Sequence, residues 1–243
     1  MDFDFIDFSK VKQYNMKLLL DGKEFVFGFK LEKNAKKEVH TINETVVVEG
    51  QAITIKEVTL YPLRADVHLS VNEENSKHLY TFEDIRLVDG EGEVWGASPA
   101  GMTASGKGED RHLYLQSSYF ERPKELYLEF SRIQALDKNK STIVIEAIKG
   151  EILEAPDRSL QNVRIDKDSV ELELHAFSWA SAYSGMNIIG TVQDALGNEL
   201  DVANRFEAAD AEKGYATIGF AIPDLASIRN PITIEVGAYP SWI

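Results

Sequence analysis

The chain of 243 residues carries 26 basic and 40 acidic side chains, a formal net charge of −14, and its hydrophobic content of 44% is typical of a globular protein. Nucleic acids and anionic membrane surfaces are bound through clustered Lys and Arg, so this charge balance argues against both as partners. The absence of cysteine excludes disulfides, thiolate zinc sites and cysteine nucleophiles.

The N-terminal segment alternates acids with apolar side chains over residues 1–8. It is not a signal peptide, because no basic segment precedes an apolar one. Its phenylalanines are expected to pack on a neighbouring sheet, with addition to the sheet of another copy as the alternative. Next, apolar residues in 18–20 and 25–29 flank Asp21-Gly22, a turn pair that predicts a β-hairpin.

Alternation of apolar and polar residues with a period of two dominates the remaining chain. It is clear in residues 53–56, 126–130 and 170–174, and it predicts antiparallel strands with one face on a core. Turn pairs of glycine with Asp, Glu or Asn separate these runs. The best candidate for a helix is short, residues 204–213, with Asn204 as its N-cap.

An internal repeat supplies the predicted architecture. Asp-x-x-Gly follows an apolar strand end at Asp89 and at Asp194, an offset of 105 residues. A proline precedes an alternating run at Pro123 and at Pro231, an offset of 108 residues. This period is too long for a solenoid and matches a β-sandwich domain of about 100 residues. The predicted fold is all-β, with two tandem immunoglobulin-like β-sandwich domains.

The domain boundary is predicted at residues 154–159, which read as a linker after the strand expected at 142–147. The N-terminal sandwich, with its extra hairpin, would cover residues 1–153. The C-terminal sandwich would cover residues 154–243.

No catalytic constellation is recognised in the sequence. Residues 101–108 fit G-x-x-x-x-G-K, but Gly108 stands where a phosphate-binding loop needs Ser or Thr, and a strand is expected to follow. A flexible hairpin loop is the favoured interpretation. The Asp-x-x-Gly segments lack the spacing of calcium loops and are interpreted as turns with glycine at positive φ.

The histidines lack the i, i+4 spacing of a zinc protease and are interpreted as surface or strand-edge residues, with clustering in space left open. They are His40, His68, His78, His112 and His175. Paired carboxylates are too abundant for one pair to stand out as acid and base. We therefore predict no catalytic, cofactor-binding or metal-binding residues, and no enzyme activity.

Aromatic residues near turns and chain ends are the candidates for ligand or partner contact. These candidates are Trp95, Trp179, Tyr183 and Trp242. Such residues can form a platform that stacks sugar rings, whereas aromatics in sandwiches usually pack in cores or between domains. Both interpretations stay open.

Several segments resemble the extracytoplasmic β-domains of unknown function found in membrane-anchored Gram-positive (Firmicute) proteins, some of which resemble sigma-factor regulators. The segments are residues 21–27, 42–45, 50–62, 85–89 and 113–117. The resemblance covers mainly residues 16–150, and it rests on structural rather than catalytic motifs.

The resemblance implies a location and a function. In that family the domains follow a short cytoplasmic segment and one transmembrane helix, so membrane contact is expected only through a segment absent from this chain. A cytoplasmic location follows instead if Met1 is the true start. We expect a non-enzymatic sensing or protein-interaction module of a bacterial cell envelope, bound to a protein partner. The alternative is a carbohydrate-binding module for a cell-wall polymer.

Overall fold

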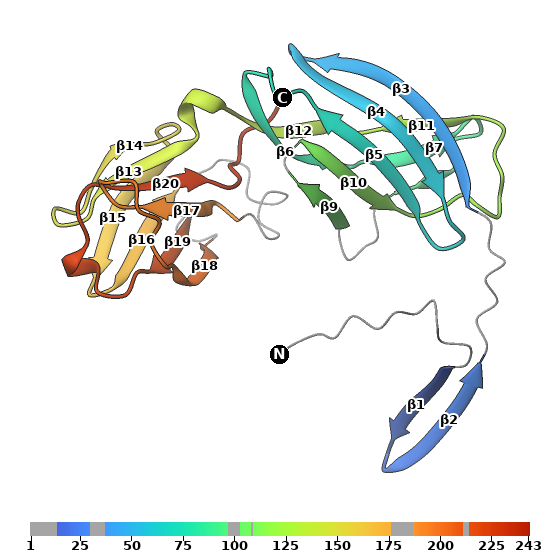
Figure 1. The fold of residues 1–243 in the computed structure, drawn as a ribbon, viewed down its shortest axis with the longest axis horizontal. Helices are drawn as coiled ribbons and strands as arrows, with labels where there is room; N and C mark the ends of the chain where they lie inside the picture. Colours follow the sequence, from blue (N-terminus) through green and yellow to red (C-terminus); the bar gives the residue numbers. More distant parts are fainter. Residues whose placement is uncertain (1–13, 30–36, 97–102, 108, 176–186, 211–213) are drawn as a thin grey trace.

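The computed structural model describes residues 14–29, 37–96, 103–107, 109–175, 187–210 and 214–243 (Figure 1). Within these ranges the regular structure is β-strand, with two short 3₁₀ turns at Lys138–Lys140 and Leu225–Ser227. The all-β prediction is confirmed. No helix in this part of the chain is long and apolar enough to cross a membrane.

A hairpin of two strands precedes the rest of the structure and stands apart from the other sheets in Figure 1. It consists of β1 (Tyr14–Leu20) and β2 (Lys23–Phe29). Asp21 and Gly22 connect them with φ angles of 48° and 71°, the left-handed values that a two-residue hairpin turn requires. The predicted hairpin is confirmed.

The first hydrophobic core lies between a five-stranded sheet and two smaller sheets. Its strands are β3 (Glu38–Val48), β4 (Gln51–Leu60), β5 (Ala65–Val71), β6 (Lys77–Glu83), β7 (Arg86–Asp89), β8 (Val94–Trp95), β9 (Thr103–Lys107), β10 (Asp110–Leu115), β11 (Leu126–Glu129) and β12 (Arg132–Asp137). The large sheet has the order β3-β4-β5-β10-β9, and the smaller ones have the orders β11-β7-β8 and β12-β6. Alternate residues of β5 are fully buried, as the period of two predicts.

The second core lies between two four-stranded sheets. Its strands are β13 (Thr142–Glu146), β14 (Glu151–Glu154), β15 (Leu160–Asp166), β16 (Ser169–Leu174), β17 (Ile189–Gln193), β18 (Ala203–Asp210), β19 (Tyr215–Ala221) and β20 (Ile232–Val236). The sheet orders are β14-β13-β20-β17 and β15-β16-β19-β18. Side chains of both sheets, Leu172 and Ile234 among them, pack together in this core.

The internal repeat is a repeat of strand order. We call the strands around the first core the first unit and those around the second core the second unit. The order β4-β5-β10-β9 in the first unit is repeated as β15-β16-β19-β18 in the second, and the pair β7-β11 is repeated as β17-β20. The first residues of β5 and β16 are Ala65 and Ser169, an offset of 104. Those of β10 and β19 are Asp110 and Tyr215, an offset of 105. The period read from the sequence therefore corresponds to a repeated arrangement of strands.

The repeated Asp-x-x-Gly segments form equivalent turns. Asp89 Oδ1 accepts hydrogen bonds from the backbone N–H groups two and four residues later, both at 2.9 Å. Asp194 Oδ1 accepts the matching pair at 2.8 and 2.9 Å. Gly92 and Gly197 adopt φ angles of 87° and 80°. The interpretation of both segments as turns fixed by the aspartate is confirmed.

The turn at Asp194 predicts a pH-dependent loss of stability. Hydrogen bonds from the Asn198 side chain and from backbone N–H groups hold the Asp194 pKa below the ordinary 3.8. Because the folded-state pKa is depressed, the contribution of this carboxylate is complete above the unfolded-state pKa and is lost as pH falls through the folded-state value. Asp194→Ala is expected to lower the midpoint of thermal unfolding at pH 7, and by progressively less below about pH 4. Asp201→Ala is the control, and a difference that does not change with pH would contradict this account.

The change from one core to the other comes earlier in the chain than predicted. The expected boundary separates residues 1–153 from 154–243, yet β13 pairs with β20 and belongs to the second core, where Ile143 and Ile145 are fully buried. The second unit therefore begins after the 3₁₀ turn at Lys138–Lys140. Linker-like composition at residues 154–159 marks a connection between two sheets of one core.

The predicted helix at residues 204–213 is wrong over its described part. Residues 203–210 form β18, which pairs with β19, and Asn204 has a φ of 49° at an irregularity in that pairing. The Phe206 ring lies directly over Gly219, where any Cβ would overlap it. Pairing and packing thus override the local helix signal, because an isolated helix of this length is marginal.

The C-terminal segment, residues 241–243, joins the two units. Ile243 and Ile133 exchange two backbone hydrogen bonds of 2.9 Å, and Ser241 O accepts a third from the Ala135 N–H at 2.8 Å. Tyr80 of β6 packs against the second core and donates its hydroxyl to Val236 O at 3.3 Å. Burial and the nearby Glu235 raise the pKa of Tyr80 to about 12, so the hydroxyl keeps its proton.

Candidate functional site

The outer face of the five-stranded sheet carries a cluster of titratable side chains. Asp66 and His68 lie on β5, and Asp110 and His112 lie on β10. Each pair is an Asp-x-His sequence, and alternation along a strand places both members on the same face. Val67, Leu69 and Leu113, which adjoin them on the two strands, belong to the first core.

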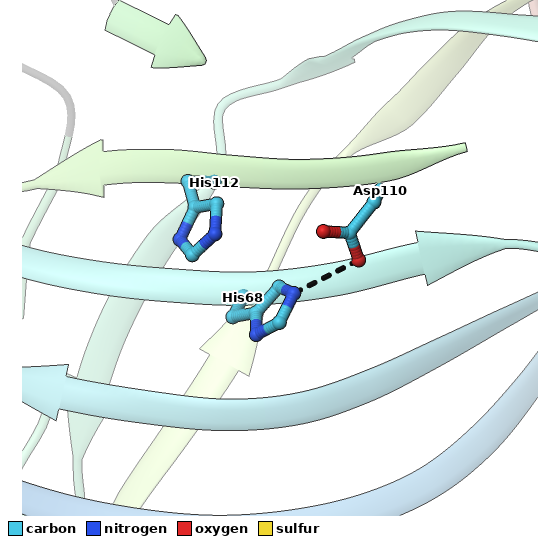
Figure 2. A group of neighbouring side chains, drawn as sticks. All are labelled: His68, Asp110 and His112. Atoms are coloured by element: carbon cyan, nitrogen blue, oxygen red, sulfur yellow. Dashed lines mark hydrogen bonds and ion pairs between the residues drawn. The ribbon is translucent and has the colours of Figure 1, made fainter. Parts of the chain in front are cut away.

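The register of β5 and β10 brings the two histidines together. His68 is directly opposite His112, and their rings stack with centroids 4.3 Å apart and planes 11° from parallel. His68 Nε2 lies 2.9 Å from Asp110 Oδ1, and His112 Nδ1 lies 2.9 Å from Asp66 Oδ1. Figure 2 shows His68, Asp110 and His112 projecting from the same side of the two strands.

A lysine from the neighbouring strand completes the cluster. The pairing of β4 with β5 is irregular between Ile55 and Glu57, and Lys56 is the extra residue there. Its Nζ lies 2.5 Å from Asp110 Oδ1. Hydrogen bonds from Lys56 and then His68 lower the pKa of Asp110 to about 2, so this carboxylate is ionised at neutral pH.

The cluster has the donor atoms of a metal site. One ligand atom each from His68, Asp110 and His112 lie within 4.8 Å of one another. The three side chains are partly exposed, with 22% of His68 and 33% of His112 accessible. The histidines do lie at the surface, as expected, but two of them form a cluster that the sequence interpretation left open. The signal that could have found it is the Asp-x-His pair in each of two strands.

The candidate aromatic residues are placed differently from one another. Trp95 is buried in the first core, with 8% of its surface exposed. Trp242 is half-buried, donates Nε1–H to Glu83 at 2.8 Å and lies under the Arg132 guanidinium at 4.5 Å. Trp179 and Tyr183 lie outside the described residues. Both described tryptophans are therefore engaged in packing within the chain.

Trp95 also borders a groove of about 570 Å³ beside the repeated turn. Acidic and basic side chains form most of its lining, namely Asp89, Glu91, Glu93, Glu121, Arg122, Lys124 and Glu125. The groove thus combines the edge of an indole with several charged groups.

The glycine-rich segment that mimics a phosphate-binding loop contains a strand. Residues 103–107 form β9, which pairs antiparallel with β10, whereas a hairpin loop was expected there. Gly101 and Gly108 lie outside the described residues. A phosphate-binding loop opens a helix, and here the next element is the strand that carries Asp110 and His112.

Strand β3 exposes an apolar surface at the edge of the same sheet. Among the strands that the structure describes, β3 pairs with β4 alone. Its exposed apolar side chains are Val39, Ile42, Val46 and Val47. The hairpin that precedes it is similar, with Leu18, Leu19, Leu20, Phe25, Val26 and Phe27 exposed.

The comparison with known families matches a family of unknown function, DUF5643, over residues 37–174. The chain belongs to this family. No curated protein and no solved structure matches the chain. The region shared with the DUF5643 family begins just before β3 and ends with β16. It includes both the histidine cluster and the β3 edge.

Proposed function

We propose that this DUF5643 protein is a non-enzymatic, extracytoplasmic sensing or protein-interaction module of a bacterial cell envelope, built from two tandem immunoglobulin-like sandwiches. The repeated strand order around two separate cores supports the tandem arrangement. The cysteine-free composition and the resemblance to envelope domains are consistent with the location. The observation that carries the interaction function is the exposed edge of β3.

The β3 edge is long and weakly protected. The strand has 11 residues and contains neither Lys nor Pro, the residues that commonly block edge strands. Its protective features are the irregular pairing with β4 between Thr41 and Glu44 and the charges of Glu38 and Glu44. Val47 is 65% exposed, so apolar surface adjoins the backbone edge with which no described strand pairs. A partner strand could therefore add to β3 through backbone hydrogen bonds and alternate side-chain contacts.

Charge identifies the kind of partner strand. Glu38 and Glu44 lie in β3 and Glu49 follows it, whereas Lys37 directly precedes it, so the edge is on balance acidic as well as apolar. A second copy would bring the same acids, and its net charge of −14 would oppose association. The occupant we propose is an extended segment of a partner protein that alternates apolar residues with Lys or Arg.

A peptide probe tests this proposal. A peptide of alternating valine and lysine, with the length of β3, is expected to bind saturably and to slow hydrogen exchange of the β3 amides. Val47→Lys is expected to weaken binding at least tenfold, because it adds a like charge and removes apolar contact. Val94→Lys, at an exposed position of β8, is the matched control and should bind as the wild type does.

Three results would overturn the interaction proposal. They are unchanged exchange of the β3 amides, equal binding of a valine–glutamate peptide, and dimerisation through β3 in sedimentation experiments. Dimerisation would identify a second copy as the occupant of the edge.

The groove beside Trp95 favours a second candidate function, binding of a cell-wall carbohydrate. Sugar sites combine an aromatic surface with polar groups that orient the hydroxyls. Here the polar groups dominate, because Trp95 is 8% exposed and presents only a small part of its ring to the groove. The test is retention of the protein on insoluble peptidoglycan, with Glu93→Gln expected to reduce it. Ile148→Ala is the control, because Ile148 is exposed and lies outside the groove. If the unmutated protein is not retained, this candidate is eliminated.

A further inference from the structure

We propose that His68, Asp110 and His112 bind a divalent first-row transition metal, such as Zn²⁺ or Ni²⁺, on the outer face of the five-stranded sheet. The inference rests on the geometry of the cluster and is independent of the function proposed for β3. Two imidazole nitrogens and one carboxylate oxygen would be the protein ligands. Water would complete the coordination, because the cluster is partly exposed.

The distances allow binding without movement of the backbone. The candidate ligand atoms lie within 4.8 Å of one another. A tetrahedral site with bonds of about 2.0–2.2 Å requires ligand atoms roughly 3.3–3.6 Å apart. Rotation of the side chains must shorten these separations by up to roughly 1.2–1.5 Å. It must also turn the imidazoles out of their stacked arrangement, now 11° from parallel, because a bound ion lies in the plane of each ring. The paired strands beneath hold the three Cα positions. The ion would replace the hydrogen bond between His68 Nε2 and Asp110 Oδ1.

Asp66 orients one of the ligands. Its Oδ1 lies 2.9 Å from His112 Nδ1, so Nδ1 is occupied and Nε2 of His112 is the atom available to a metal. The Asp66 side chain is only 15% exposed, so its position is well defined. Histidines that bind metals usually donate their second N–H to a carboxylate in this way. Asp66 is thus a positioning residue for the proposed site.

The donor atoms of the cluster determine which metal ions it could bind. Imidazole suits Zn²⁺, Cu²⁺ and Ni²⁺, whereas Mg²⁺ and Ca²⁺ prefer sites made of oxygen ligands alone. The chain contains no cysteine, so thiolate sites for softer ions are excluded. Asp110 supplies the one carboxylate oxygen among the three ligand atoms.

Lys56 opposes metal binding and provides a diagnostic substitution. Its Nζ lies 2.5 Å from Asp110 Oδ1, where it would repel the incoming ion. The lysine side chain is 37% exposed and can swing into solvent. Lys56→Gln is expected to tighten metal binding at least about fivefold, because two unit charges about 4 Å apart repel by about 1 kcal/mol in water and the ion carries two. If the cluster had only a structural role, Lys56→Gln would not tighten metal binding.

Calorimetric titration of the metal-stripped full chain tests the proposal. Zn²⁺ is expected to bind saturably with one ion per chain, and Mg²⁺ is expected not to bind. His68→Gln and His112→Gln should each weaken Zn²⁺ binding more than tenfold, and Asp66→Asn by roughly 10–100-fold. His40→Ala is the matched control, because His40 is exposed on β3 of the same sheet and outside the cluster.

Nuclear magnetic resonance of the imidazole protons adds a readout on the unmutated protein. Zn²⁺ should shift the signals of His68 and His112 and leave that of His40 in place. The proposal is overturned by the absence of saturable Zn²⁺ binding, by binding that survives both glutamine variants, or by equal loss in the His40→Ala control. Circular dichroism of each variant confirms that lost binding does not reflect unfolding.

Discussion

Phe220→Ala is expected to lower the free energy of unfolding by about 3–5 kcal/mol. Phe220 lies in β19 with 1% of its surface exposed, opposite Val170 of β16. Its ring is among the largest fully buried side chains of the structure. The substitution removes the transfer free energy of the ring and leaves a cavity that the paired strands cannot close by collapse.

Denaturant unfolding followed by circular dichroism measures this loss. Leu69→Ala, in the first core, is expected to cost about 2–5 kcal/mol by the same mechanism and shows whether both cores matter. Leu153→Ala is the control, because Leu153 is 53% exposed on β14 and should change stability by less than about 0.5 kcal/mol. A loss below 1 kcal/mol for Phe220→Ala would mean that the second core is not packed as described.

Local patterns predicted the local parts of this fold. The turn at Asp21-Gly22 and the two Asp-x-x-Gly turns depend on neighbouring residues alone, because the aspartate and the backbone amides that it accepts from lie within four residues. Alternation likewise marked most strands, since a period of two is a property of each strand by itself.

Long-range pairing was beyond the reach of such patterns. Thr142–Glu146 follows the strands of the first core directly in the sequence, so sequence order assigns it to the first sandwich. In the structure it pairs with Ile232–Val236, far along the chain. Residues 203–210 carry a helix signal, and their partner β19 makes them a strand. Both errors arise because the free energy of pairing and burial depends on residues distant in sequence.

The histidine cluster likewise depends partly on local pattern and partly on long-range strand pairing. Alternation along each strand is sufficient to place Asp66 with His68, and Asp110 with His112. What the sequence could not supply is that β5 and β10 are neighbours with His68 opposite His112. The stacking of the rings and the approach of Lys56 both follow from that register and from the irregularity in β4.

Trp242→Ala is expected to lower the free energy of unfolding by about 2 kcal/mol and to loosen the connection between the two units. The indole is half-buried, so the loss should fall below the 3–5 kcal/mol typical of a fully buried aromatic. The lost free energy includes the hydrogen bond from Trp242 Nε1 to Glu83 Oε1 at 2.8 Å and the contact of the indole with the Arg132 guanidinium. Both partners belong to the first unit, whereas the chain reaches Trp242 from the second.

Differential scanning calorimetry distinguishes a joining role from simple local packing. If residues 241–243 couple the two cores, the wild type unfolds in one transition and Trp242→Ala broadens or divides it, because each core then unfolds at its own temperature. Ile148→Ala, at a position 81% exposed, is the control and should leave the transition unchanged. Two separate transitions in the wild type would contradict the coupling. In that case the backbone hydrogen bonds between Ile133 and Ile243 would stabilise the C-terminal segment without linking the stability of the two sandwiches.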